Sequence, residues 1–428
     1  MTAHALCRAV KTLGASDRGT TTQEAMRFIM EQSRAARWLD RGLHLSASTP
    51  LPVAFALLNG LRCFARMRVT GAPGGVLACA HRPNERRAVA RVRAAAGALP
   101  WSDVVLDLGD VRAALGDLDG GAMNALARAA RLAETMRGRH HHFEVVRAIE
   151  LVFHYQRFGA ILDRGRHRAA VISTYSNPWG VALHAAARRR GLPVALVMHG
   201  MPQWPVPRLD YDLAVVPNEM AAATLRRAGC GLGDVIIESS TPEPAPMPPA
   251  FRNPRLVVGM LLSKDPVVAE VMRWLRALLD RDDVASIVVR PHPASLWSGM
   301  GAAIGGLDRA RVSVGTAPAP LDDLRRCDLA IAGNSSIHVD AAAAGIPSVH
   351  ARGLDHVADG ALPFVDDGLV LSIGGPRDLA PAHVLRFYQR PEWLPILRRY
   401  ARQPDRAGAG ADDAAAIRAR MTALVEGT

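Results

Sequence analysis

The sequence predicts an α/β protein made of two doubly wound domains, each built on a mostly parallel sheet. Short runs rich in β-branched residues alternate with helical stretches from residue 74 to 238, and the alternation starts again at residue 256. This pattern is typical of βαβ units. Between the two series, residues 241–250 hold five prolines in ten positions, a density that excludes a helix or a central strand. We therefore expect two domains joined by a hinge.

The 428 residues divide into four expected parts. Residues 1–70 form an N-terminal helical extension, residues 71–240 the first domain, residues 241–255 the proline-rich linker, and residues 256–428 a second domain that carries the C-terminal helices. Two domains of roughly 200 residues each agree with the usual size of a single hydrophobic core.

Apolar periodicity predicts the elements in order. In the extension, helical spacing covers residues 22–39 and 51–67. In the first domain we expect strands at 75–80, 103–108, 169–174, 193–198, 213–216 and 235–238, with helices at 84–96, 122–137, 143–164, 179–190 and 219–228. In the second domain we expect strands at 256–261, 286–289, 311–314, 329–332, 348–350 and 369–372, with helices at 267–279, 296–304, 321–325, 337–344, 379–388, 391–402 and 412–425.

Composition and charge narrow the class of protein. Apolar residues make up 49% of the chain, and no apolar stretch approaches the length of a spanning helix. Five scattered cysteines form no Cys-x-x-Cys pair, and the N-terminus lacks an apolar signal region, which favours a cytoplasmic protein. The net charge of +12 has two interpretations: solvated basic faces of an arginine-rich protein, or attraction to polyanions such as phosphorylated substrates or an anionic inner membrane surface. No nucleic-acid-binding signature accompanies it.

Two motifs of the second domain stand where a ligand is expected, because open parallel sheets bind ligands beyond the carboxyl ends of their strands. The first is Arg290-Pro-His292-Pro293, directly after an apolar run. Two prolines stiffen the turn, and a cation and an imidazole suit a phosphate. A proline-capped strand end with an incidental histidine is the alternative interpretation.

The second motif is Gly333-Asn334-Ser335-Ser336, between a strand and a helix that carries Asp340. A serine at a helix start leaves first-turn N–H groups and hydroxyls available to an anion, and glycine allows close backbone approach. An ordinary helix cap is the alternative. Together, the two motifs predict a site that binds an anion such as a phosphate.

The His292-Pro293 and Ser335-Ser336 pairs resemble the HP and Ser-Ser motifs of bacterial GT-B transferases that use cytidine-activated donors: sialyltransferases, Kdo transferases and CDP-glycerol glycerophosphotransferases. In those families, the histidine and the serine pair hold the donor's phosphate. The resemblance extends over residues from about 167 to 375. It implies a GT-B fold, in which two Rossmann-like domains face a central cleft, with the acceptor on the first domain and the nucleotide-sugar on the second.

The resemblance leaves the catalytic base unassigned. The acidic motif of sialyltransferases belongs in the first domain, whereas the triplet Asp366-Asp367-Gly368 lies in the second. Sugar transfer with inversion needs a base near the acceptor hydroxyl. We rank the candidates that follow strands of the first domain in the order His199, His81, Glu85 and Asp110.

We therefore expect a metal-independent glycosyltransferase, with no cofactor, that moves a sugar from a cytidine-nucleotide donor to a capsule or lipopolysaccharide acceptor. The donor would be CMP-Kdo-like, CMP-sialic-acid-like or a CDP-polyol, and a lipid-linked acceptor would bring the protein to the inner membrane face. The alternatives are a UDP-sugar transferase or UDP-N-acetylglucosamine 2-epimerase on the same fold, and a non-catalytic nucleotide-sugar-binding scaffold protein.

Overall fold

The computed structural model describes most of the chain from residue 67 onward. The described residues are 57, 60, 61, 64, 67–106, 120–136, 142–173, 175, 178–202, 206–238, 249–292, 300–308, 310–317, 319–356, 362–401 and 409–427. Most of the expected extension 1–70, residues 241–248 of the expected linker, and the candidate residues Asp110 and Pro293 lie outside them.

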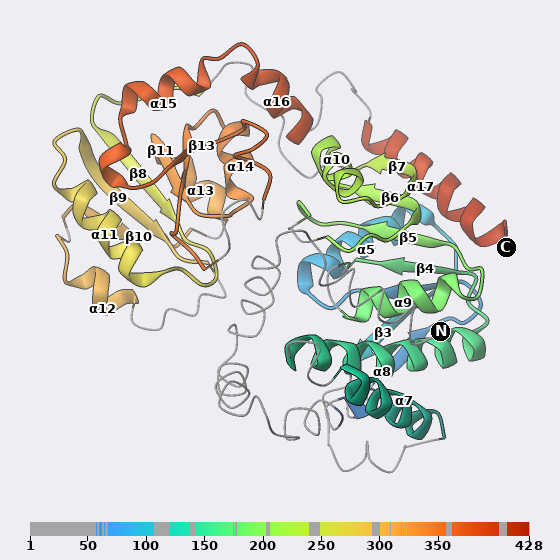
Figure 1. The fold of residues 1–428 in the computed structure, drawn as a ribbon. Coiled ribbons are helices and arrows are strands. Elements are labelled where there is room, and N and C mark those ends of the chain that lie inside the picture. Colours follow the sequence, from blue (N-terminus) through green and yellow to red (C-terminus); the bar gives the residue numbers. More distant parts are fainter. Residues whose placement is uncertain are drawn as a thin grey trace.

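The first domain is a seven-stranded sheet covered by helices on both faces (Figure 1). Its strand order is β1-β3-β2-β4-β5-β6-β7, in which β1 runs antiparallel to β3 and the other neighbours are parallel. The strands are β1 (Met67–Gly71), β2 (Val76–Cys79), β3 (Trp101–Leu106), β4 (Ala169–Ile172), β5 (Val194–Val197), β6 (Tyr211–Val216) and β7 (Leu232–Ile237). The helices are α5 (Pro83–Ala96), α7 (Gly120–Met136), α8 (His142–Gly165), α9 (Pro178–Arg188) and α10 (Glu219–Arg227).

The second domain is a six-stranded parallel sheet in the order β10-β9-β8-β11-β12-β13. Its strands are β8 (Leu256–Leu261), β9 (Val284–Arg290), β10 (Val312–Val314), β11 (Leu329–Ala332), β12 (Ser348–Ala351) and β13 (Leu371–Ile373). Its helices are α11 (Val268–Leu279), α12 (Met300–Gly305), α13 (Pro320–Leu324), α14 (Ile337–Ala343), the 3₁₀ turn η1 (Pro376–Asp378), α15 (Pro381–Tyr388) and α16 (Trp393–Tyr400).

Both sheets confirm the predicted fold class of two doubly wound, Rossmann-like domains. Strands β2, β4, β5 and β11 are buried along their whole length, since helices cover both faces, and this explains why they read as unbroken apolar runs. The sequence did not predict β1, which is mostly exposed at the edge of its sheet. An edge strand with one open side carries a weaker apolar signal than a central one.

The last helix, α17 (Ala409–Glu426), packs on the first domain. Ile417, Met421 and Val425 are buried in the cluster that contains Val89 of α5. The sequence-based division had placed the C-terminal helices with the second domain. An apolar helix face shows that a partner exists, but only the tertiary structure shows which sheet it covers.

The two domains also meet where α10 lies beside α16. Met220 of α10 is buried in the core of the second domain. Arg227 of α10 pairs with Asp367 at 3.0 Å, and the Tyr400 hydroxyl donates to the same carboxylate at 2.5 Å. The Asp366-Asp367-Gly368 triplet thus contributes its second carboxylate to a contact between domains.

Within the part of the chain that the structure describes, no helix combines the length and apolar character needed to cross a bilayer.

Candidate functional site

Three strand ends of the second sheet lie level with one another. Leu261, the last residue of β8, is in register with Arg290 of β9 on one side and with Ala332 of β11 on the other. The strand order reverses between β8 and β11, because β8 leads to β9 whereas β11 leads to β12. Ligands of open α/β sheets bind beyond the carboxyl ends at such a switch point. We call the loops that follow these three strands the second-sheet edge.

His292 and Lys264 both lie in loops of the second-sheet edge. His292 follows β9 and is half buried, and its pKa is lowered by this burial and by the nearby positive charge of Lys264. The imidazole is therefore neutral at pH 7 and has a cation beside it. A lysine and a neutral imidazole together suit a phosphate, to which both can donate hydrogen bonds.

Sequence reasoning missed Lys264, although the sequence holds a signal for it. Lys11 and Lys264 are the only two lysines in the chain, in which arginine otherwise supplies the positive charge. A lysine shortly after a strand of an arginine-rich protein is a candidate for a role that arginine does not fill, since the two side chains differ in geometry and hydration.

The serine pair follows β11, as expected, and its hydroxyls make few hydrogen bonds to the described residues. Ser336 is the residue before α14 and is exposed, and its side chain makes no capping bond. The Ser335 hydroxyl accepts only a long bond, 3.4 Å, from the N–H of Ile337. Within the described part of the chain, no other hydrogen bond occupies these hydroxyls, so both are candidates to bind a ligand.

The contacts of Gly333 and Asn334 in the structure are with other residues of the protein. The Asn334 N–H donates to Asp355 at 2.8 Å, and a side chain at Gly333 would collide with that same carboxylate. The Gly333 carbonyl lies 2.9 Å from Nε2 of His338. We expected the absence of a side chain at Gly333 to make room for a ligand. In the structure it makes room for the Asp355 carboxylate. The pKa of His338 falls to about 3, chiefly because the ring is fully buried.

Asp340 lies one helical turn after Ser336, on the same face of α14. Burial raises the pKa of its carboxyl group to about 6. Among the described residues, no hydrogen bond or ion pair engages its side chain. A carboxylate in this setting accepts hydrogen bonds from hydroxyl groups, such as those of a ribose or a sugar.

Arg290, a predicted donor-binding residue, makes a buried ion pair. Its guanidinium donates to Asp323 at 2.5 Å and to the carbonyl of Ala317 at 2.6 Å, and the two charged side chains are 11% and 3% exposed. Gly315 makes room, because a Cβ there would contact both partners. Arg290 thus ties the loop after β10 to α13. Thirty-three positions separate it from Asp323, so local sequence gave no sign of the pair.

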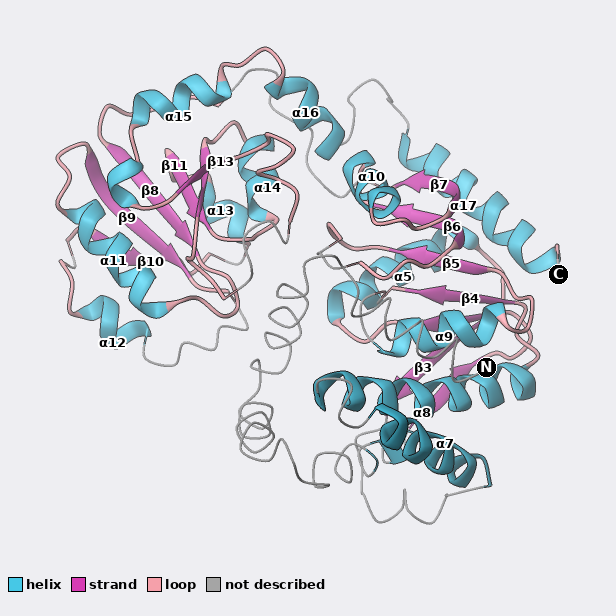
Figure 2. Cartoon of the chain, viewed as in Figure 1, coloured by secondary structure: helices cyan, strands magenta, loops and turns pink. Residues whose placement is uncertain are grey.

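The first sheet has its own switch point, between β2 and β4, because β2 leads to β3 and β4 leads to β5. His81 follows β2, Ser173 follows β4, and His199 lies just beyond β5; we call these positions the first-sheet edge. In Figure 2 the arrowheads of β4, β5 and β6, like those of β8 and β9, point toward the region between the domains.

Glu85, a predicted catalytic candidate, caps its own helix. Its carboxylate accepts the N–H of His81 at 2.8 Å and the N–H of Arg82 at 3.0 Å, and the residue is 2% exposed. An acid at the third helical position satisfies N–H groups that the first turn leaves without partners. The contact fixes the loop that carries His81.

The two candidate histidines are both neutral at pH 7. Burial lowers the pKa of His199 and that of His81, and Glu85 opposes the shift in both, whereas nearby arginines reinforce it. The His81 ring packs 4.3 Å from the Trp179 ring, and its Nε2 lies 3.6 Å from the sulfur of Cys79. A neutral imidazole is the protonation state that a general base requires.

Among the residues that the structure describes, no group of three or more His, Cys, Asp or Glu side chains is arranged to hold a metal ion.

No protein-family model matches the sequence, and no curated protein is similar to it. Several solved structures are similar over most of their length. The UDP-GlcNAc 2-epimerase of Methanocaldococcus jannaschii, in complex with UDP-GlcNAc and UDP, is 10% identical, with 81% of this chain and 99% of that chain covered and a TM-score of 0.46. MurG of Acinetobacter baumannii is 13% identical, with 81% and 100% covered and a TM-score of 0.43. The lipopolysaccharide outer core galactosyltransferase WaaB is 10% identical, with 79% and 98% covered and a TM-score of 0.44.

Proposed function

We propose that the chain is a GT-B-type glycosyltransferase that takes a sugar from a nucleotide-sugar and transfers it to a glycan acceptor. The observation that supports the proposal is the second-sheet edge, where Lys264 is near enough to His292 for its charge to help lower the pKa of the imidazole, and the loop carrying Ser335 and Ser336 begins level with theirs. A cation, an imidazole and two hydroxyls at a topological switch point form a phosphate site.

The proposed reaction exchanges one C–O bond for another. The acceptor hydroxyl attacks the anomeric carbon, the bond from that carbon to the phosphate oxygen breaks, and the electron pair leaves with the phosphate. Lys264, His292 and the serine hydroxyls stabilise the negative charge that develops there, which is the main electrostatic task of the step.

The acceptor's proton goes to a base at the first-sheet edge, and His199 remains our first candidate, ahead of His81. Both rings are held neutral by burial, whereas Glu85 is committed to the start of α5. Asp340 accepts hydrogen bonds from hydroxyls of the donor. Asp110 lies outside the described residues and keeps its place as a candidate on sequence alone.

We propose that the nucleotide of the donor is a cytidine or a uridine nucleotide, and the experiment below distinguishes the two. The cytidine expectation rests on the motif resemblance alone. The acceptor is proposed to be a capsule or lipopolysaccharide glycan, with the positive net charge favouring phosphate-bearing or membrane-linked forms.

A thermal-shift panel of CMP, CDP, UDP, GDP and ADP tests the proposal. A nucleotide at 100 times its dissociation constant should stabilise the protein by about 2.7 kcal/mol, and His292→Ala should remove most of that shift. The donor class is then tested by incubating the protein with the matching nucleotide-sugar. Stabilisation by none of the five nucleotides would reject the proposal, and steady release of UDP from UDP-N-acetylglucosamine without any acceptor would favour the epimerase alternative.

A further inference from the structure

Asp355 lies behind the second-sheet edge and binds the loop that carries the serine pair. It follows β12 and is 6% exposed. One carboxylate oxygen accepts the Asn334 N–H at 2.8 Å, and the other lies 3.4 Å from the Asn334 side-chain amide. Hydrogen bonds to a buried carboxylate are shorter and stronger than those to neutral acceptors. The backbone just before Ser335 is therefore attached to this single side chain.

The segment around Asp355 is also joined to the loop that carries Lys264. Asp355 and Pro266 form an isolated antiparallel bridge. On either side of it, the Val267 N–H donates to Leu354 at 2.9 Å, and the His356 N–H donates to the carbonyl of Asp265 at 3.3 Å. One short segment thus holds the loop after β8 through its backbone and the loop after β11 through a carboxylate.

We propose that Asp355 is a positioning residue that sets the distance between Lys264 and the Ser335–Ser336 hydroxyls, and so shapes the phosphate site without touching the ligand. The inference rests on the proposed function for its ligand. The required close approach is built into the sequence, because any side chain at Gly333 would collide with the Asp355 carboxylate.

The exchange Asp355→Asn tests this role with little change in volume. The amide keeps one acceptor oxygen but replaces the other with an NH₂ group, which would face an N–H donor of Asn334. The loop after β11 must then shift or lose a bond, whereas Lys264, His292 and both serines stay in the sequence.

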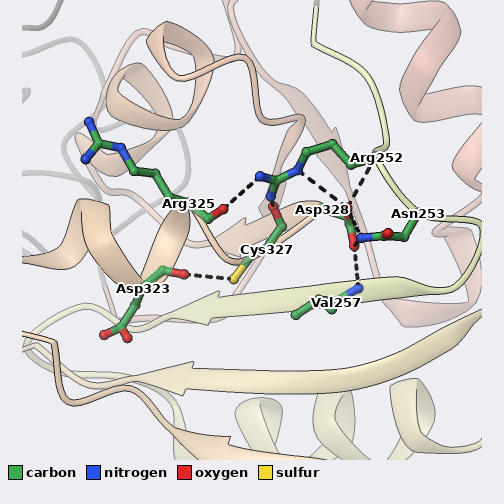
Figure 3. A network of polar contacts seen from close by, with 7 residues as sticks. All are labelled: Arg252, Asn253, Val257, Asp323, Arg325, Cys327 and Asp328. Atoms are coloured by element: carbon green, nitrogen blue, oxygen red, sulfur yellow. Dashed lines mark hydrogen bonds and ion pairs between the residues drawn. The ribbon is translucent and has the colours of Figure 1, made fainter.

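The same sheet offers a matched control in Asp328 (Figure 3). It precedes β11 at the opposite, amino edge and is 1% exposed. Its carboxylate accepts the Val257 N–H at 2.9 Å and the Asn253 amide at 3.0 Å, and the Arg252 guanidinium lies 3.7 Å away. Asp328→Asn therefore disturbs an equally buried aspartate, with comparable backbone bonds, at a place far from the proposed ligand.

The first measurement is the dissociation constant of UDP and of CMP by titration calorimetry, at a temperature well below the unfolding transition of every variant. We expect Asp355→Asn to weaken binding of whichever nucleotide the wild type prefers by about tenfold, and Asp328→Asn to change it less than twofold, although both lower the melting temperature. Equal affinity losses in the two variants, or no loss in Asp355→Asn, would overturn the inference.

The second measurement needs no ligand. Hydrogen exchange followed by mass spectrometry should show faster exchange in peptides covering residues 333–337 and 262–267 of Asp355→Asn, and unchanged exchange there in Asp328→Asn. If the wild type binds neither nucleotide, the proposed function fails while this result still decides whether Asp355 holds both loops. Unaltered exchange in either peptide would show that it does not.

Discussion

Among the described residues, the carboxyl edge of the first sheet includes two neutral histidines near several arginines, whereas the second-sheet edge includes Lys264, His292 and the hydroxyls of Ser335 and Ser336. Both edges lie at a switch point of strand order, although the first sheet has seven strands, with β1 antiparallel, and the second has six parallel strands. The difference teaches that this fold supplies two places for a ligand and that the loop residues decide the chemistry of each. We propose proton transfer at the first edge and phosphate binding at the second.

The largest expected effect separates the two edges through His199. Replacing it with alanine should lower the rate of sugar transfer about 10²- to 10⁴-fold, the range for losing a general base, and leave the nucleotide dissociation constant within twofold. His167→Gln, a buried histidine just before β4 at the opposite edge, is the control and should keep its transfer rate. Because burial lowers the His199 pKa, the wild-type rate should persist below pH 6.5 and fall only at lower pH. Equal losses of transfer rate and nucleotide affinity in His199→Ala would contradict the proposal that the first edge transfers the proton and the second edge binds the nucleotide.

The second prediction concerns stability and Arg290. Arg290→Ala leaves the buried Asp323 without its partner and should lower the free energy of unfolding by about 3–5 kcal/mol, measured by urea denaturation. The nucleotide dissociation constant should change by less than about threefold, since a tenfold change needs 1.4 kcal/mol of lost contact. The double variant R290M/D323L, which removes both charges, should recover much of the stability. A large loss of nucleotide affinity with an unchanged free energy of unfolding would show that Arg290 contacts the ligand.

The third prediction sharpens the role of Lys264. Lys264→Met should weaken nucleotide binding by about tenfold, equal to about 1.4 kcal/mol. Lys264→Arg should restore it only in part, because a planar guanidinium does not reproduce a compact ammonium group. Lys11→Met, a change at the other lysine of the chain, serves as the control in the same calorimetric assay. Full recovery by arginine would mean that charge alone matters at this position.

The smallest expected effect is that of Asp340→Asn, and it has opposite signs for stability and binding. The folded-state pKa of about 6 lies above the ordinary value of 3.8, so the native state binds more protons between these pH values, and the group costs stability as pH rises through that window. The variant should be more stable by roughly 1 kcal/mol at pH 7 and equal to wild type below pH 4. Nucleotide-sugar affinity should fall severalfold. A variant that gains stability without losing affinity would exclude Asp340 from the site.

Most candidate residues at the two edges could be located from the sequence. His292, Ser335, Ser336, His81 and His199 were predicted from one rule, that polar residues directly after apolar strands gather at a carboxyl edge, and the structure places each of them there. Their roles as ligands and bases stay predictions. Glu85 was located correctly by the same rule, but the bonds that its carboxylate makes to the backbone were not foreseen.

The sequence by itself determined the alternation of strands and helices, and thereby the two parallel sheets, because burial on both faces imposes continuous apolar runs that are readable over a few residues. Only the tertiary structure decided that Arg290 pairs with Asp323, that Asp355 approaches Gly333, that the charge of Lys264 acts on His292 and that α17 covers the first sheet. These contacts join residues from about 20 to more than 300 positions apart, and nothing in local propensity or period encodes which distant partner a side chain meets.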